Sequence, residues 1–547
     1  MNTISSKELL FDDAARAQLL DGVNILANAV RVTMGPRGQN VVIENPGRSP
    51  HLTKDGVTVA QAVNLRDRFR NLGVQIIKEA ASRTAETAGD GTTTATVLTQ
   101  ALFQEGLKMI AAGHSGAELR RGIELASKHV IIALKQAASP VQHDEEIVQV
   151  GTISANGDET IGKLLCEALN KVGRDGVVTV EEAKGFETTL EVVEGMQVDR
   201  GYVSPYFINN QEKMSVLLDS PHILLTNKKL NSIKDILPIL EKVHNEKRSL
   251  LIVADEIGGD ALQGLVLNKM KGILNVCAIR APEFGETRLE ALQDLGIVLG
   301  CDPILSAGGE TFANVSLSQL GTCRKAHITK NSCTFVDAAG DTVEIQRRSS
   351  AIKEQLGVPG LSAPAVDALT RRLTRLSGGI AIIKVGGATE IELKERKDRV
   401  DDALHATKAA IDEGILPGGG VALVRAASKL NIDKITKKKL SSGEKVGITV
   451  LRQACSAPLS QIVRNTGGSA ELILAKVQEK SNTVGYDARN DEFTDMLECG
   501  IVDPLKVVRS ALENATSAAC MLLSVGCAMI DDVGENDDEP GGLTHAI

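Results

Sequence analysis

The pattern of apolar residues changes character twice along this chain, and this double change limits what the chain can fold into. Apolar residues recur at helical spacing over residues 9–136 and again from 388 to about 530. Between them, residues 250–253 and 274–279 are short apolar runs separated by a helical stretch, 260–272, as in a βαβ unit. We therefore predict a multi-domain chain of α and α/β parts, in which two helical ends form one domain and the α/β middle is inserted into it.

Further strand-like runs, rich in β-branched residues, lie at the borders of the middle segment. They cover residues 176–182, 188–193 and 379–385, and a shorter run at 40–43 interrupts the first helical part. Four residues at changes of pattern are candidate hinges or, alternatively, ordinary turn residues: Pro140, Gly195, Gly379 and Gly414.

The composition is that of a globular protein whose core lacks large aromatic side chains. The 547 residues include nine Phe, three Tyr and no Trp, so Ala, Val, Ile and Leu must fill the cores. A net charge of −9 gives no general basic surface for nucleic acid, and aromatic side chains for stacking on single strands are scarce. We therefore expect no nucleic-acid partner.

The cysteines and the longest uncharged run bear on where the protein works. Nine cysteines, an odd number without a CxxC pair, indicate free thiols in a reducing compartment rather than disulfides or a zinc site. Residues 514–530 are uncharged but short for a membrane span, and predict a buried helix. Residues 1–20 lack the features of a secretory or transit signal. We expect a cytoplasmic protein with no membrane association.

Residues 89–94, Gly-Asp-Gly-Thr-Thr-Thr, mark a turn that leads straight into a helix N-terminus. The two glycines allow a ligand to approach the backbone closely, and the helix dipole with its unpaired N–H groups favours an anion. Asp90 would repel a bare phosphate, so its position favours a divalent cation between the two. The segment predicts a phosphate and magnesium site; a turn that only caps the helix is an equally good interpretation of this segment alone.

Four other segments have the same character of glycine turns and carboxylates. They are residues 33–38 (TMGPRG), 53–56 (TKDG), 400–407 (VDDALHAT) and 418–420 (GGG). No GxxxxGK[ST] motif occurs, so the chain is not a P-loop protein. Taken separately, each segment is more typical of a turn or cap than of a site.

In combination, the segments resemble the group I chaperonins, the GroEL-type ATP-dependent folding machines. The resemblance runs in the family's order from about residue 9 to 530 and is carried by TMGPRGQNVV, TKDGVTVA, AGDGTTTATVL, GTISAN, DRGYVSPYFIN, KVGGATEIELKERKDRVDDALHAT, DEGILPGGGVAL and GIVDPLKVVRSAL. It implies an equatorial ATP-binding domain (1–136 and 413–547), an intermediate hinge domain (137–193 and 381–412) and an apical domain (194–380). It also implies heptameric rings, two of them stacked.

The resemblance implies a role for each pocket residue. Asp90 would ligate magnesium, with potassium as a further possible ion. Asp402 would arrive from the intermediate domain and orient or deprotonate the attacking water, and Asp55 would assist it. On sequence grounds alone, Asp402 is alternatively a helix N-cap. The nucleotide itself would be held by Thr33, Met34, Gly35, Pro36, Lys54, Gly91, Thr92, Thr93, Thr94, Gly419, Asp487, Ala488 and Asp503.

An apolar surface on the apical domain is the second implied site. Leu237 and Leu240 are three apart on one predicted helix, and Leu262 and Val266 four apart on the next, so each pair makes an apolar stripe. Such stripes are more often core than surface. The resemblance places them in a groove that would bind non-native proteins and a competing GroES-type co-chaperonin, with these residues: Tyr202, Tyr206, Phe207, Leu237, Leu240, Leu262, Val266 and Leu267.

The chain departs from the family pattern in four places. Asp487 stands where the family commonly has Asn near the adenine, and a carboxylate cannot donate the amide hydrogen bond. The acidic tail, 531–547, lacks the Gly-Gly-Met repeat and is predicted to be disordered. Residues 357–364 contain two prolines in a stretch that is mostly helical in the family, and 437–439 are three lysines near a variable loop.

These observations leave three functions to weigh. The leading one is an ATP-driven folding chamber that captures non-native proteins. The alternative is a specialised paralogue that acts mainly as a protein-binding module with weak ATP cycling. The intact Asp55, Asp90 and Asp402 favour the first function, and the altered tail and Asp487 leave room for the second. A small-molecule phosphotransferase is poorly supported because no acceptor site is apparent.

Overall fold

The computed structural model divides the chain into two compact units. The first consists of Met1–Cys166, Glu182–Glu187 and Val385–Ile547, and the second of Glu167–Glu181 and Thr188–Lys384. Both ends of the sequence thus share one unit, as the nested pattern predicts, whereas the three-domain division stays a prediction. The structure describes residues 7–44, 50–174, 176–183, 185–193, 195–211, 213–283, 285–305, 312–356, 363–377, 379–432, 435–436 and 439–531.

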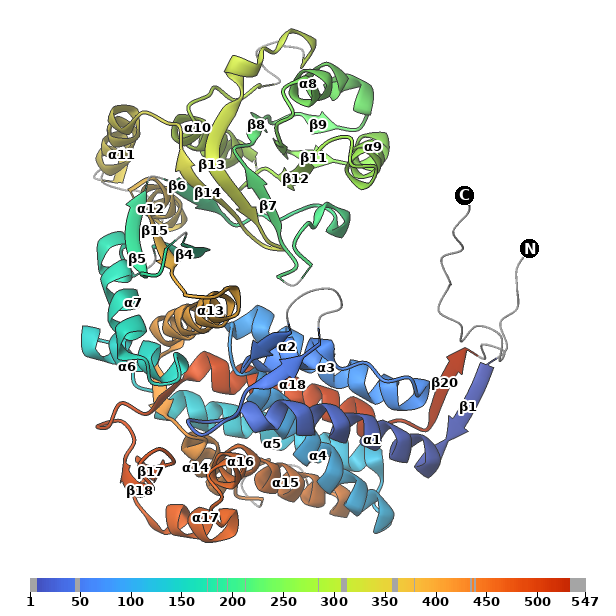
Figure 1. Cartoon of the computed structure of the whole chain (residues 1–547). Coiled ribbons are helices and arrows are strands. Elements are labelled where there is room, and N and C mark those ends of the chain that lie inside the picture. The colour runs from blue at the N-terminus through green and yellow to red at the C-terminus, as the bar shows by residue number, and fades with distance from the viewer. Residues whose placement is uncertain are drawn as a thin grey trace. The chain divides into compact units, whose positions relative to one another are not determined.

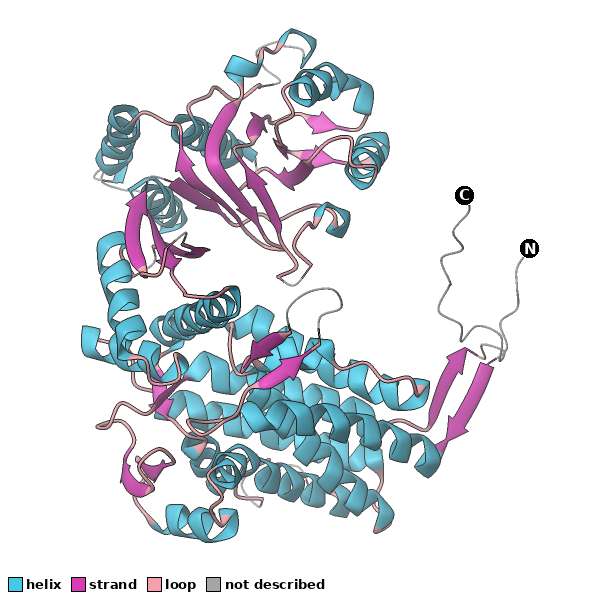
Figure 2. Ribbon diagram, in the orientation of Figure 1, coloured by secondary structure: helices cyan, strands magenta, loops and turns pink. Residues whose placement is uncertain are grey.

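The first unit consists mainly of helices (Figures 1 and 2). The helix α18 packs against α3, α4 and α5, and buries Leu512, Ala515 and Ala519 among them, so small aliphatic side chains form this core. The helices are α1 (Asp12–Val30), α2 (Gly56–Ala62), α3 (Arg68–Ala88), α4 (Thr92–Ala111), α5 (Gly116–Ala137), α6 (Asp144–Ser154), the start of α7 (Glu159–Val172), α13 (Glu390–Glu413), α14 (Val421–Ser428), α15 (Ser442–Ala454), α16 (Ala457–Asn465), α17 (Ala470–Glu479) and α18 (Leu505–Leu523).

Short antiparallel strand pairs join these helices. They are β1 (Lys7–Phe11) with β20 (Cys527–Asp531), β2 (Val41–Ile43) with β3 (His51–Thr53), β16 (Ile415–Pro417) with β19 (Val502–Pro504), and β17 (Val484–Asp487) with β18 (Glu492–Asp495). The run at 40–43 was predicted correctly. The expectation of an unbroken helical pattern from 388 to 530 was wrong, because strands of three to five residues are too short to show an alternating pattern.

The uncharged run 514–530 is divided between α18 and β20. The part of it in α18 is largely buried, as predicted. Among the described residues, no helix is both long and apolar enough to cross a membrane. All nine cysteines are free thiols.

The second unit is built on a mixed sheet whose strands follow the order β12-β10-β8-β13-β14-β6, with β7 paired to β13. The predicted βαβ unit is present, since β10 and β12 are parallel neighbours in the sheet and α9 lies between them in the chain. The strands are β6 (Gly195–Val198), β7 (Val216–Asp219), β8 (His222–Leu225), β10 (Leu250–Ala254), β12 (Val276–Arg280), β13 (Gly321–Ile328) and β14 (Cys333–Ala338).

Helices and two smaller sheets complete the second unit. The smaller sheets are β9 (Lys229–Leu230) with β11 (Glu256–Ile257), and a three-stranded one of β4 (Val177–Glu182), β15 (Ile380–Val385) and β5 (Thr189–Val193). The helices are α8 (Ile233–Asn245), α9 (Gly259–Met270), α10 (Gly285–Leu299), α11 (Thr342–Leu356) and α12 (Ala363–Ser377). The predictions for 357–362, for Lys437 and Lys438, and for the tail 532–547 lie outside the described residues.

Candidate functional site

One cavity in the first unit brings the predicted nucleotide residues together. It has a volume of about 660 Å³ and is bordered by the N-terminal ends of α2, α4 and α14, by α6 and α13, and by the β17–β18 hairpin. The role of each lining residue stays a prediction. The cavity is lined by every residue that we assigned to the nucleotide, the metal or the catalytic step: Thr33, Met34, Gly35, Pro36, Lys54, Asp55, Asp90, Gly91, Thr92, Thr93, Thr94, Asp402, Gly419, Asp487, Ala488 and Asp503.

The N-terminus of α4 borders this cavity without a side-chain cap. Gly89 ends α3 at φ +74° and Gly91 precedes α4 at φ +84°, and such left-handed conformations favour glycine. A Cβ atom on Gly91 would lie 2.6 Å from Cγ1 of Val507, so a larger residue would clash. The first-turn N–H groups and the helix dipole therefore favour an anion at this end of the cavity, beside the hydroxyls of the threonines that follow.

A second helix N-terminus, that of α14, borders the same cavity. Gly420 precedes the helix at φ +79°, again with no side-chain cap. The β16–β19 pairing places Leu416 opposite Asp503, and the Asp503 carboxylate accepts a hydrogen bond from the Gly420 N–H. The glycine turn and Asp503 are therefore adjacent because two short strands pair.

The loop that contains Met34 is held by a residue that the sequence gave no reason to select. Asn465, at the end of α16, donates from Nδ2 to the carbonyl oxygens of Arg31, at 3.0 Å, and Met34, at 2.8 Å. The Thr33 hydroxyl donates to the Val30 carbonyl at 2.9 Å. These bonds fix the wall of the cavity that Thr33 and Met34 provide.

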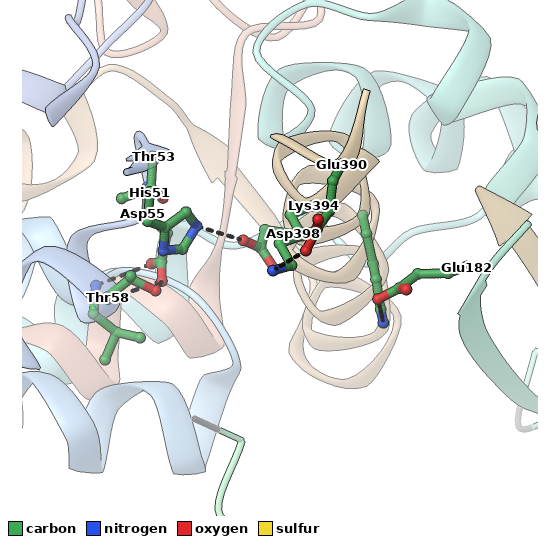
Figure 3. Close-up of polar contacts among 10 residues, drawn as sticks. His51, Thr53, Asp55, Thr58, Glu182, Glu390, Lys394 and Asp398 are labelled. Carbon is green, nitrogen blue, oxygen red and sulfur yellow. Dashed lines mark hydrogen bonds and ion pairs between the residues drawn. The ribbon is translucent and has the colours of Figure 1, made fainter. Parts of the chain in front are cut away.

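Asp55 is the N-cap of α2. Its Oδ1 accepts from the Val57 N–H at 2.9 Å, and its Oδ2 accepts from the N–H and the hydroxyl of Thr58 at 2.9 and 2.6 Å (Figure 3). Its own N–H donates to Thr53 Oγ1 at 3.0 Å. The carboxylate thus has a structural role that the sequence analysis did not assign, while its catalytic role stays a prediction.

Asp402 lies in the interior of α13, so the alternative that it caps a helix is wrong. The N-cap of α13 is Thr389, whose hydroxyl oxygen accepts from the Glu392 N–H at 3.2 Å. Asp402 instead lines the cavity, where it is partly exposed. Burial, followed by the negative charges of Asp55 and Asp90, raises the pKa of Asp402 well above the ordinary value for an aspartate.

Two further carboxyl groups in the cavity are perturbed in the same direction. Burial raises the pKa of Asp90, against a hydrogen bond from the Gly91 N–H, and the charge of Asp55 raises it further. Burial and the charge of Asp90 raise the pKa of Asp503 to about 7. Carboxylates that raise one another's pKa in a partly desolvated space are an environment that a bound cation would relieve.

The donor set fits magnesium only if a phosphate ligand completes it. Among the described residues, no group of three or more His, Cys, Asp or Glu side chains could hold a metal ion by itself. Magnesium commonly takes one or two protein carboxylates and fills its remaining positions with substrate phosphates and water. Asp90, next to the uncapped N-terminus of α4, meets that requirement.

Asp487 is engaged in the turn of the β17–β18 hairpin. Its Oδ1 accepts from the N–H of Arg489 at 2.8 Å and of Asn490 at 3.3 Å, and its Oδ2 accepts from Asn490 Nδ2 at 2.7 Å. The carboxylate therefore holds the loop that carries Ala488, and only its remaining acceptor capacity is available to a ligand.

Arg489 reaches from this hairpin to the turn between α6 and α7, and nothing in the sequence pointed to it. Its Nη2 donates to the Asn156 carbonyl at 3.0 Å, and its own carbonyl accepts from Arg37 Nη2 at 3.2 Å. A Cβ atom on Gly157 would lie 1.9 Å from the same Nη2, so this contact requires glycine there. Because Asn156, Gly157 and Arg489 all line the cavity, the contact crosses one side of it.

The predicted apolar surface belongs to the second unit. There α8 packs on α9, and α9 on the short 3₁₀ turn Pro205–Phe207. Tyr206, Leu267 and Leu237 are 66, 51 and 44 % exposed, and Tyr202, Leu262 and Val266 are half-buried. Met270 and Ile273, at the end of α9, are also exposed although the sequence analysis did not select them.

Phe207 and Leu240 require a correction. Phe207 is fully buried and Leu240 is 6 % exposed, and both belong to the core of the second unit. In this structure they support the apolar surface from beneath and do not line it. Helical spacing identifies residues that share a face, but it does not say how deeply each side chain on that face is covered.

Comparisons with known proteins identify the fold and the family. Two crystal structures of the chaperonin gp146 from the bacteriophage EL 2 (Pseudomonas aeruginosa), obtained in the presence of ATP-BeFx, share the fold with TM-scores of 0.69 and 0.62. Each covers 96 % of this chain and 99 % of the phage protein at 24 % sequence identity. Residues 26–532 match the model of the TCP-1/cpn60 chaperonin family, and the chain therefore belongs to that family.

Proposed function

We propose that this chaperonin hydrolyses ATP in the cavity of the first unit and uses the cycle to promote the folding of non-native proteins. The observation that carries the proposal is the convergence of Asp402, Asp90 and the uncapped N-terminus of α4 on one cavity. Membership of a chaperonin family supports the chaperone role. Nucleotide binding is supported by the bacteriophage chaperonin, which was crystallised in the presence of ATP-BeFx.

The phosphates of ATP would lie at the N-terminus of α4, with Thr92, Thr93 and Thr94 as hydroxyl donors and Lys54 as a nearby cation. When bound, a magnesium ion held by Asp90 would neutralise phosphate charge; a potassium ion is a second candidate. Asp402 would orient the attacking water and accept its proton, a contribution typically worth about 10²–10⁴-fold in rate.

The other half of the cavity would hold the nucleoside. Thr33, Met34, Gly35 and Pro36 would form one wall. Gly419, Asp487, Ala488 and Asp503 would surround the adenine and ribose. The glycine at 419 suits a close approach, because it adopts φ +64° and a Cβ atom there would lie 3.1 Å from Met496 Cε.

Non-native proteins would bind to the exposed apolar side chains of α8, α9 and the preceding 3₁₀ turn. An apolar patch of this kind binds unfolded segments without reading their sequence. A GroES-type co-chaperonin would compete for it and close a folding chamber. We further propose heptameric rings, two of them stacked, in a bacterial-type cytoplasm.

A second candidate is a specialised paralogue that binds proteins with weak ATP cycling. The departure that favours it is Asp487, whose carboxylate is already engaged by its own turn. The Arg489 contact with Asn156 would also have to open for nucleotide exchange on that side. A stand-alone phosphotransferase gains no support, because the lining residues provide no separate acceptor site.

The test is magnesium-dependent ATP turnover of the purified assembly beside the Asp402→Ala variant, with binding of a fluorescent ATP analogue measured on both. We expect turnover in the wild type, a loss of about 10²–10⁴-fold in the variant, and similar nucleotide affinity in the two. Equal turnover in both would contradict the role of Asp402. An inactive wild type that still captures non-native proteins would favour the binding paralogue.

A further inference from the structure

The two segments that contain the proposed catalytic carboxylates also meet at a second pair of residues, His51 and Asp398. His51 is on β3, four residues before Asp55, and Asp398 is on α13, four residues or about one helical turn before Asp402. The imidazole of His51 points toward the carboxylate of Asp398 (Figure 3). A contact at this point therefore links the turn that holds Asp55 to the helix that holds Asp402.

The contact has the geometry of a loose ion pair. His51 Nε2 lies 3.9 Å from Asp398 Oδ2, and the two side chains are 24 and 30 % exposed. Nε2 itself is buried and has no hydrogen-bond partner in the part of the chain that the structure describes. A buried ring nitrogen without a hydrogen-bond partner costs free energy, and the nearby carboxylate of Asp398 is the polar group that can offset this cost.

The other ion pairs of α13 in Figure 3 do not link it to the Asp55 turn. Lys397 binds Glu182 on β4 at 2.8 Å. Lys394 binds Glu390 at 2.9 Å one turn away on the same helix, and both of these side chains are well exposed. The Lys394–Glu390 pair lies within one helix and provides a matched control.

We propose that His51 and Asp398 are positioning residues that hold α13 against β3, so that Asp402 and Asp55 share one cavity. The inference rests on the proposed ATP hydrolysis, and it assigns the residues that keep Asp402, the proposed base, in place. Neither residue needs to touch the nucleotide. Opening this pair would let the part of α13 that contains Asp402 shift away from the Asp55 turn, while α6 and α18 still pack on the helix.

Of the two residues, Asp398 also acts on Asp402 through its charge. The negative charge of Asp398 is one of the causes that raise the pKa of Asp402. Removing His51 therefore loosens α13 and leaves that charge in place. Removing the charge of Asp398 loosens α13 but eases the ionisation of Asp402, so its two effects partly cancel.

The experiment is a double-mutant cycle on steady-state ATP turnover of the assembled protein, with His51→Gln, Asp398→Asn, the double variant and Lys394→Gln as the control. We expect His51→Gln to lower kcat roughly two- to fivefold, the range for a partly exposed pair, with KM for ATP changed by less than about twofold. Asp398→Asn should have a smaller effect, and the double variant should equal Asp398→Asn. Lys394→Gln should match the wild type.

Hydrogen exchange of the α13 amides without nucleotide provides a readout that does not depend on turnover. Amides near Asp398 and Asp402 should exchange faster in His51→Gln than in Lys394→Gln. If the wild type shows no turnover, the proposed function fails, and faster exchange in His51→Gln would still support the positioning role. The inference is wrong if the loss of kcat in the double variant equals the product of the two single losses. It is also wrong if the α13 amides exchange at the same rate in His51→Gln and Lys394→Gln. His51→Asn replaces His51→Gln if the latter does not assemble.

Discussion

The cavity of the first unit and the apolar surface of the second differ in how much of their structure is contained in local motifs. The cavity is built from turns such as Gly89–Gly91 and Gly419–Gly420, in which positive φ values fix the chain locally. The surface is built from helical stripes, in which Leu237 is exposed and Leu240 is buried three residues later. The glycine motifs located the polar site through the family resemblance that they carry in combination, whereas apolar periodicity located a face without its depth.

The largest effect that we expect concerns the metal ligand in the cavity. Asp90→Asn should lower kcat for ATP by about 10³-fold and remove its dependence on magnesium, since a bound metal ion contributes several kcal/mol to such a reaction. Turnover measured against magnesium concentration, with and without a chelator, checks this. Asp412→Asn is the control, because it removes a carboxylate from the partly exposed pair with Lys506. Magnesium-dependent turnover that persists in Asp90→Asn would contradict the assignment.

The next prediction compares two leucines on α8. Leu240→Ala should lower the free energy of unfolding by about 2–5 kcal/mol, because it leaves a cavity in the core, whereas Leu237→Ala should change it by less than about 0.5 kcal/mol. Urea denaturation of both variants measures the difference. At temperatures where both variants are folded, Leu237→Ala should reduce the capture of a non-native protein more than Leu240→Ala does. Equal stability losses would mean that Leu237 is also buried.

A pH effect is expected from Asp503, whose pKa burial raises to about 7. In the unfolded chain the group has a pKa near 3.9, so between about pH 4 and 7 the folded state binds the extra proton, and stability rises as the pH falls. Asp503→Asn should stabilise the nucleotide-free protein by about 2–4 kcal/mol at pH 8. The gain should shrink toward pH 4. Urea midpoints measured across this range check it, and a gain independent of pH would contradict the raised pKa.

A smaller effect is expected where Arg489 crosses the cavity. Arg489→Ala should speed release of a fluorescent nucleotide about five- to twelvefold, since it removes a charge-assisted hydrogen bond to Asn156 worth about 1–1.5 kcal/mol. Stopped-flow displacement measures the rate. Gly157→Ala should act in the same direction, because its methyl group would displace the guanidinium. Unchanged release in both variants would show that this contact does not limit exchange.

The smallest effect is expected at the departure near the adenine. Asp487→Asn restores an amide donor and keeps an acceptor for the Arg489 and Asn490 N–H groups. Nucleotide affinity should rise about two- to threefold. This gain is smaller than one complete hydrogen bond would give, because the turn already engages the side chain. Titration with ATP and GTP checks this and the base preference. A loss of affinity would mean that the carboxylate itself binds the nucleotide.

The sequence predicted the fold class and the nesting from periodicity, whereas the set of cavity residues followed from the family resemblance that the ordered motifs carry. It did not predict Asn465, Arg489 or the His51–Asp398 contact. Each of these joins segments far apart in the chain through one side chain, and no local pattern marks such a partner. The strands β16 to β20 were missed because they are too short to show an alternating pattern and are recognised as strands only through their pairing with another strand.

The most direct test of the account measures ATP turnover and capture of a non-native protein side by side on three assembled proteins: the wild type, Asp402→Asn and Leu237→Glu. The account predicts that Asp402→Asn loses turnover by about 10²–10⁴-fold but still captures, and that Leu237→Glu loses capture but keeps turnover. Capture lost with Asp402→Asn at unchanged turnover, or wild-type behaviour of both variants, would contradict the assignment of the two functions to these two regions.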